Sequence, residues 1–227
     1  MRARQFGVRR LLWTAIGVAA AITTSLVLFP ALDVALSSLA YAADGFVLPR
    51  SGLVLAMSWL VTILSWVAIL GALLLLVATL RAGRPVVWAL DTSRLLLILL
   101  TFFLVPGLLV NTILKHHVGR ARPIEIVQFG GDAQFSRAGF PADQCRRNCT
   151  FPSGEASAAF ALAAVGVATG SPAVLAGALG IGTLVSIVRV LTGAHFVSDV
   201  ASSGLLTLLA IVLLDRLLVR RPRAAPG

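Results

Sequence analysis

Much of this 227-residue chain consists of long stretches without a single charged residue. They occupy residues 11–30, 51–80, 95–114, 156–188 and 200–214. An α-helix needs about 20 apolar residues to cross the hydrocarbon core of a bilayer. The stretches are continuous and rich in leucine and alanine, which favours helices over strands. The sequence therefore predicts an all-α, polytopic membrane protein.

The composition excludes two other classes of protein. Apolar residues make up 58% of the chain, charged residues only 12%, and the mean hydropathy is +0.95. A water-soluble domain of this length could not bury so many apolar side chains. Disordered chains are polar and charged, so disorder is excluded by the same values.

The net charge of +10 indicates contact with a lipid surface. Most basic residues are arginines at the two termini and in short connections, where they can anchor helices against anionic lipid. A nucleic-acid-binding face would gather them on one domain surface instead. We therefore expect the lipid bilayer as a partner and no nucleic acid.

Six transmembrane helices fit the apolar stretches, in a single membrane-embedded domain over residues 1–227. Gly170, Ser171 and Pro172 predict a turn that divides the fourth stretch in two. The expected helices span about 11–30, 53–80, 94–115, 154–169, 173–192 and 196–218. A long loop over 116–151 joins the third and fourth helices, and loops of this length are usually functional or disordered. Its aromatic residues favour order.

Arginine counts orient the helices by the positive-inside rule. The N-terminal tail, the connection 81–94 and the tail after residue 216 are rich in arginine and lie on one side, which is therefore cytoplasmic. The opposite connection, 31–52, carries Asp33, Asp44 and Arg50. The loop 116–151 also lies opposite despite five arginines, so we expect these arginines to serve a purpose other than topology. The arginine- and alanine-rich composition is typical of a bacterial inner membrane protein.

Two features of the outer side leave alternatives open. Ala40, Tyr41 and Ala42 resemble a signal-peptidase site, and cleavage there would leave five helices. Cys145 and Cys149 are the only cysteines and both fall on the oxidising side, so a disulfide that closes a small loop is expected. Two thiols alone are too few ligands for a metal site.

Polar and ionisable residues lie where the spans end, although such residues are costly there and are functional candidates by default. Helices 94–115 and 173–192 run outward and helices 154–169 and 196–218 run inward, so all four tips emerge on the same outer face. The residues at these tips are Lys115, Arg122, Ser153, Gly154, Glu155, Arg189, His195 and Asp199.

The chemistry of this set fits phosphoryl transfer. Lys115, Arg122 and Arg189 supply three cations, and arginine binds phosphate oxygens through two parallel hydrogen bonds. Ser153 and Gly154 begin a helix, where backbone N–H groups and the positive end of the helix dipole favour an anion.

His195 and Asp199 are four residues apart and so share one helical face. An aspartate that fixes the imidazole tautomer leaves the other ring nitrogen as a nucleophile, which predicts a phosphohistidine intermediate. Three cations can neutralise the phosphoryl group without a metal ion, so no cofactor is expected.

These motifs resemble the signature of the type-2 phosphatidic acid phosphatase superfamily, which includes the vanadium haloperoxidases. The signature runs through Lys115-x6-Arg122-Pro123, Ser153-Gly154 after Pro152, and Arg189-x5-His195-x3-Asp199. The resemblance implies a helical membrane phosphatase that acts on lipid phosphates or diphosphates at the outer leaflet. It implies His195 as the nucleophile with Asp199 as its partner. The implied phosphate ligands are Lys115, Arg122, Ser153, Gly154 and Arg189.

Glu155 departs from the family pattern, because the second motif usually ends in a histidine that protonates the leaving oxygen. Glu155 could take up a proton together with a phosphate dianion and act as the acid. It could instead orient the attacking water, or simply favour the helix dipole. Weak acid catalysis would favour a diphosphate or sugar 1-phosphate as substrate. His116 and His117 are possible substitute acids.

Several functions share this set of residues. The leading hypothesis is an outer-face lipid phosphatase for isoprenyl diphosphates, the lipid A 1-phosphate or phosphatidate-type lipids. A lipid-to-lipid phosphotransferase would use the same site, and a protein that binds lipid diphosphate without turnover would retain it. A transporter is disfavoured because 51–80 and 156–188 carry no polar residues beyond serine and threonine. The sequence leaves the oligomeric state open.

Overall fold

The computed structural model describes residues 2–43, 45–49, 51–87 and 89–219. Some of the charged residues that predict the orientation in the membrane lie outside the described residues: Asp44, Arg50, Arg220, Arg221 and Arg223. The chain is a helical membrane protein. In the described part, five helical segments are long and apolar enough to cross a bilayer, and a sixth apolar segment, Gly154–Thr169, is shorter.

The elements follow the predicted helices closely. Their bounds are α1 (Arg2–Leu28), α3 (Gly52–Ala82), α4 (Thr92–Phe102) with η1 (Phe103–Leu114) and α5 (Lys115–His117), α6 (Gly154–Ala161), α7 (Ala163–Thr169), α8 (Pro172–Leu191), and α9 (Val197–Leu214) with η4 (Asp215–Val219). The largest difference is α1, which begins before the expected residue 11.

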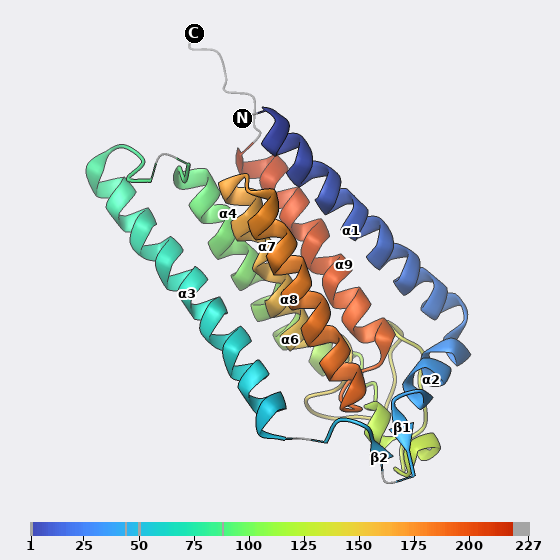
Figure 1. Cartoon of the computed structure of the whole chain (residues 1–227). Coiled ribbons are helices and arrows are strands. Elements are labelled where there is room, and N and C mark those ends of the chain that lie inside the picture. Colours follow the sequence, from blue (N-terminus) through green and yellow to red (C-terminus); the bar gives the residue numbers. More distant parts are fainter. Residues whose placement is uncertain (1, 44, 50, 88, 220–227) are drawn as a thin grey trace.

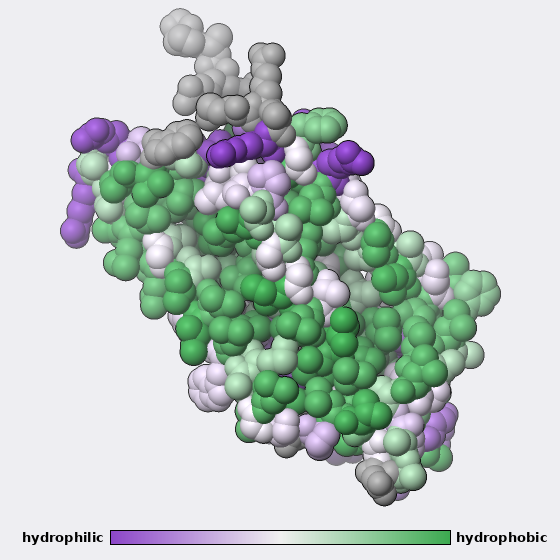
Figure 2. All heavy atoms as spheres, viewed as in Figure 1, coloured by the Kyte–Doolittle hydropathy of each residue, from purple (hydrophilic) through white to green (hydrophobic). Residues whose placement is uncertain are grey.

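The long helices run side by side, and the beginning of α1 and the α3–α4 connection lie at one end of the bundle (Figure 1). The loop between α5 and α6, the short helix α2 and the hairpin β1–β2 lie at the other end. Large apolar side chains cover the helical midsection seen in Figure 2. On α3, Trp59, Ile63 and Trp66 are each more than half exposed. Such an apolar exterior suits hydrocarbon rather than water.

The segment η1 is a π-helix that contains Pro106. Proline lacks the N–H that an α-helix would use and clashes with the preceding turn. Polar side chains bind two of the carbonyl groups here: Asn111 Nδ2 donates to Pro106 O at 2.7 Å, and Thr112 Oγ1 donates to Gly107 O at 3.0 Å. The third span therefore reaches the site end of the bundle as an irregular helix.

A tight turn joins α7 to α8, as the sequence predicts. Gly170 adopts the left-handed conformation that ends α7, and the side chain of Ser171 accepts a hydrogen bond from Val174 N at the start of α8. The two helices then approach closely at Gly166, where a Cβ atom would lie 2.6 Å from Leu175 Cα.

Residues 31–52 are predicted as a connection, but they contain α2 (Pro30–Ser38) and a hairpin of β1 (Tyr41–Ala42) with β2 (Gly45–Phe46). Pro30 opens α2 at a position where its missing N–H costs nothing. Asp33, counted above as an outer-loop charge, is buried to 1% exposure. This corrects its interpretation, because a buried carboxylate needs a partner inside the protein.

The long loop before α6 is ordered by aromatic packing. Its short helices are η2 (Pro123–Glu125) and η3 (Val127–Phe129). Phe129 lies against Tyr41 and Phe46 of the hairpin, with ring centroids 5.1 and 5.4 Å away. These contacts fix the loop over the ends of the helices.

Candidate functional site

Lys115 and Arg122 meet at one residue of the loop. The Lys115 ammonium donates to Asn148 Oδ1 at 3.0 Å, and Arg122 Nη2 donates to Asn148 O at 2.8 Å. Arg122 comes directly before η2, where its backbone N–H donates to Glu125. Asn148 therefore holds the two cations of the first motif close together.

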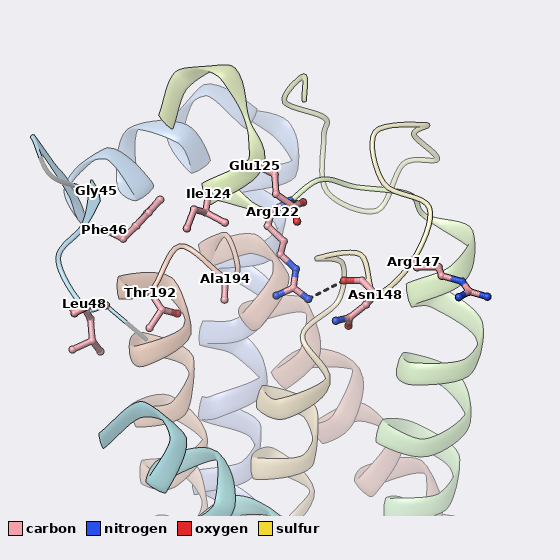
Figure 3. A pocket seen from close by; sticks show the side chains of 11 residues that line it. Gly45, Phe46, Leu48, Arg122, Ile124, Glu125, Arg147, Asn148, Thr192 and Ala194 are labelled. Atoms are coloured by element: carbon pink, nitrogen blue, oxygen red, sulfur yellow. Dashed lines mark hydrogen bonds between the residues drawn. The ribbon is translucent and has the colours of Figure 1, made fainter. Parts of the chain in front are cut away.

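A cavity of about 630 Å³ opens beside Arg122 (Figure 3). Arg122 reaches into it from the loop, between Ala194 and Asn148. Phe46 and Leu48, from the hairpin side, form part of its apolar lining. The cavity thus combines a cation suited to phosphate binding with space for a larger chemical group. One of its lining residues, Ala194, directly precedes His195.

The start of α6 provides a helix N-terminus at the same end of the bundle as this loop (Figure 1). The Ser153 hydroxyl caps this helix by accepting a hydrogen bond from Ala156 N at 3.3 Å. Ser153 is fully buried, and its carbonyl accepts from Ser157 N. The backbone of this first turn is therefore fixed in place.

Glu155 and Arg189 form an ion pair. The second carboxylate oxygen of Glu155 accepts a hydrogen bond from Ser58 Oγ of α3 at 3.0 Å. The pair joins the predicted acid to a predicted phosphate ligand, and it links both to the outlying helix α3. A phosphate bound by Arg189 would compete directly with Glu155.

His195 lies in the bend before α9 and Asp199 lies in the first turn of that helix, but they do not form a direct hydrogen bond. His195 Nδ1 is 3.8 Å from Asp199 Oδ2, beyond hydrogen-bond range. The hydroxyl of Thr150 lies 3.0 Å from His195 Nδ1 and 2.6 Å from Asp199 Oδ2. All three residues are buried. Thr150 thus links a pair that the sequence predicts to interact directly.

Arg120 extends this buried network to the N-terminal part of the chain. Its guanidinium donates to Asp199 Oδ1 at 2.5 Å and to Asp33 Oδ2 at 2.8 Å. It also lies over the Phe196 ring, 4.1 Å from the centroid. Asp33 in turn accepts from the Ser198 backbone N–H at 3.0 Å. Arg120 is completely buried, so it is an internal counter-charge and neither a headgroup ligand nor a solvated loop residue.

Burial lowers the pKa of His195 below its ordinary value. The nearby negative charge of Asp199 acts in the opposite direction, while the charges of Arg122 and Lys115 lower the pKa further. The imidazole is therefore neutral at neutral pH, which a nucleophile requires. Burial raises the pKa of Asp33, and the charge of Arg120 opposes this rise.

The structure brings most of the predicted residues to one end of the bundle. Lys115 lies within electrostatic range of Arg122, Arg189 and Asp199. His116 and His117 differ, because both are exposed and use Nδ1 on backbone carbonyls of their own helical turn. Cys145 and Cys149 form a disulfide, and Thr150 follows it directly.

Sequence reasoning missed Ser58, Asn148, Thr150 and the pairing of Asp33 with Arg120. Asp33 carried a usable signal, because a carboxylate beside apolar spans is unusual in a chain with nine acidic residues. Arg120 carried no such signal, because residues two apart in extended backbone point to the same side, and its spacing from Arg122 would have placed both at the site. Thr150 and Asn148 are ordinary loop residue types and gave no signal.

Several known proteins are similar to this chain in sequence. A family model described as the PAP2 superfamily matches residues 94–223. A protein of Rhizobium leguminosarum named lipid A 4′-phosphatase is 40% identical over 117 residues, which are 50% of this chain and 50% of that protein. A protein of Francisella tularensis subsp. novicida with the same name is 35% identical over 120 residues, 51% of this chain and 54% of that protein. The chain spans about half the length of these relatives. No solved structure matches it significantly.

Proposed function

Because the chain belongs to the PAP2 superfamily, we propose that it is an integral-membrane lipid phosphatase with His195 as its nucleophile. The observation that carries this proposal is the environment of His195. It is buried, its Nδ1 is occupied by Thr150, and it follows a wall residue of the cavity that contains Arg122. Its Nε2 is then the ring nitrogen that attacks phosphorus.

The reaction proceeds in two steps. His195 Nε2 forms a bond to phosphorus while the bond from phosphorus to the lipid oxygen breaks, and water then hydrolyses the phosphohistidine to release phosphate. Lys115, Arg122 and Arg189 bind the phosphoryl oxygens, together with backbone N–H groups at the start of α6. These cations stabilise the charge that spreads over the oxygens in the transition state.

Glu155 is the acid for the leaving oxygen. Its ion pair with Arg189 keeps it charged before substrate binds. When a phosphate engages Arg189, Glu155 loses part of its counter-charge and gains a neighbouring dianion. Both changes favour uptake of a proton by the carboxylate, which can then be donated.

The substrate is a phosphorylated lipid with a large polar headgroup. Two observations support this choice: the 630 Å³ cavity beside Arg122, and the name lipid A 4′-phosphatase carried by relatives at 35% and 40% identity. A 4′-phosphate leaves as an ordinary alcohol and so needs the acid. This favours a glycolipid monophosphate over the diphosphates that a weak acid would require.

The site opens on the outer face of a bacterial membrane. The exposed arginines Arg81, in the last turn of α3, and Arg84, in the connection to α4, belong to the part of the chain that lies at the end of the bundle opposite the site (Figure 1). By the positive-inside rule that end is cytoplasmic. The disulfide at the site end supports the same orientation, because disulfides persist in oxidising compartments.

Phosphate release by the purified protein tests the function. We expect release from lipid A, with less from phosphatidic acid and isoprenyl diphosphates, and none from His195→Ala. His116→Ala is the matched control and should remain active, since its side chain bonds only its own helix. Radiolabelled phosphate on a second lipid would instead identify a phosphotransferase. Release that persists in His195→Ala would overturn the proposal.

The role of Glu155 has a separate test. Glu155→Gln should lower kcat on a lipid monophosphate by about 100-fold or more, within the usual range for general acid catalysis, and much less on a diphosphate, whose leaving group needs no acid. Asp143→Asn removes an exposed carboxylate of the loop before α6 and serves as the control. Equal large losses on both substrates would refute the acid role.

A further inference from the structure

Asp199 cannot orient His195 by direct contact in this structure. The closest carboxylate oxygen is 3.8 Å from His195 Nδ1. Both oxygens of Asp199 are already engaged by other donors: Arg120 Nη1 reaches Oδ1 at 2.5 Å, and Phe196 N reaches Oδ2 at 2.8 Å. The carboxylate is therefore held towards Arg120 and the start of α9.

The hydroxyl of Thr150 fills the interval between the two residues. Its neighbours are Asp199 Oδ2 at 2.6 Å, His195 Nδ1 at 3.0 Å and Ala194 O at 3.2 Å. A hydroxyl has a single proton, and the short contact to a charged carboxylate is where that proton lies. A lone pair of the same oxygen then faces His195 Nδ1, which must carry the proton of this second hydrogen bond.

Thr150 is firmly held in this position. Its backbone N–H donates to Arg120 O at 3.0 Å, and its side chain is completely buried. The preceding residue, Cys149, is tied to Cys145 by the disulfide. One arginine thus binds Asp199 with its side chain and Thr150 with its backbone.

We propose that Thr150 is a positioning residue, whose hydroxyl couples Asp199 to His195 and fixes the imidazole as the tautomer protonated at Nδ1. The catalytic consequence of this inference rests on the proposed function, because the tautomer leaves the Nε2 lone pair free to attack phosphorus. It concerns hydrogen bonds of the resting protein, however, so it can be tested without substrate.

The first test is spectroscopic. In ¹⁵N-histidine-labelled protein with His116→Gln and His117→Gln, His195 is the one remaining histidine. We expect its ¹⁵N shifts at neutral pH to report a protonated Nδ1 and an unprotonated Nε2. Thr150→Ser should preserve this pattern, and Thr150→Val should replace it with a mixture of tautomers. If Thr150→Val does not fold, Thr150→Ala provides the same comparison.

The second test is kinetic. Thr150→Val should lower kcat by about 10- to 100-fold, the usual worth of a hydrogen bond to a charged group, with KM nearly unchanged. Thr150→Ser should stay within about threefold of the parent. A Thr150→Val protein with the Nδ1–H tautomer and full kcat would overturn the proposal, as would a Thr150→Ser protein that loses the tautomer. Failure of the proposed function would appear differently, as an inactive parent with the expected tautomer.

Discussion

Arg120 illustrates how one buried cation can organise a site that it does not enter. Its guanidinium is shared by Asp33 and Asp199, and its Nε donates to Ser136 O at 2.8 Å. Removal of the cation would leave two carboxylates buried without their common partner. Breaking a buried pair in this way is far more costly than losing a surface one.

Arg120→Met should therefore destabilise the protein by about 3–5 kcal/mol. Thermal unfolding in detergent would measure the loss. Arg137→Gln is the matched control, because Arg137 is an exposed arginine of the same loop and should change stability by less than about 0.5 kcal/mol. Equal effects of the two substitutions would contradict the role assigned to Arg120.

The lowered pKa of His195 predicts how stability depends on pH. The unfolded chain takes up a proton on this histidine as the pH falls through about 6.5, while the folded protein resists it. The unfolded state then binds more protons, so the unfolding free energy decreases as the pH falls below about 6.5.

Unfolding temperatures measured between about pH 7.5 and 5.5 would check this prediction. His195→Gln should show a smaller decrease in Tm towards acid than the parent protein does. Parallel curves for the two proteins would indicate that burial of His195 leaves its proton affinity unchanged.

At the scale of residues, the sequence identified the ionisable groups better than their connections. Lys115, Arg122, Arg189 and His195 are unusual at the ends of apolar spans, so their positions alone marked them. The link through Thr150 depends on how the loop passes over α9. That path is set by tertiary contacts, which no local pattern encodes.

At the scale of elements, the spacing of helices is set by glycines at close contacts. A Cβ atom at Gly166 would lie 2.6 Å from backbone atoms of Leu175 in α8, and backbone cannot move aside as a side-chain tip can. Gly180 of α8 has no heavy atom within 4 Å of such a Cβ atom. The two glycines therefore offer a direct comparison.

Gly166→Ala should destabilise the protein by about 1–3 kcal/mol, as overpacking does. Gly180→Ala should be neutral or stabilising by up to about 1 kcal/mol, because alanine favours the helix and meets no obstacle. Thermal unfolding of both variants in the same detergent checks the pair. A stable Gly166→Ala protein would mean that α7 and α8 can separate without cost.

The helical spans were predictable because burial in lipid demands uninterrupted apolar runs. The helix α2 was not predictable, because it is short and the residues around it show no helical periodicity over several turns. It is held by the aromatic residues of the hairpin and by Asp33, whose partner Arg120 lies 87 positions away. Contacts at such separation emerge only from the assembled bundle.

At the scale of the whole molecule, the orientation in the membrane can be tested with single cysteines. Gln128→Cys places an exposed thiol within η3 at the site end, and Arg84→Cys places one between α3 and α4. In spheroplasts, a membrane-impermeant maleimide should label the first variant, and the second only after permeabilisation. The reverse pattern would place the site in the cytoplasm.

Asp33 has a consequence for how this chain can be processed or recombined. It precedes residues 94–223, the part shared with the family, yet it neutralises the arginine that holds Asp199. Proteolysis after Ala42 would discard this carboxylate together with the first helix. A chimaera that joined residues 94–223 of this chain to a different N-terminal half would face the same deficit unless the new half placed a carboxylate beside Arg120. Retention of the N-terminal segment thus becomes a requirement of the chemistry as well as of membrane insertion.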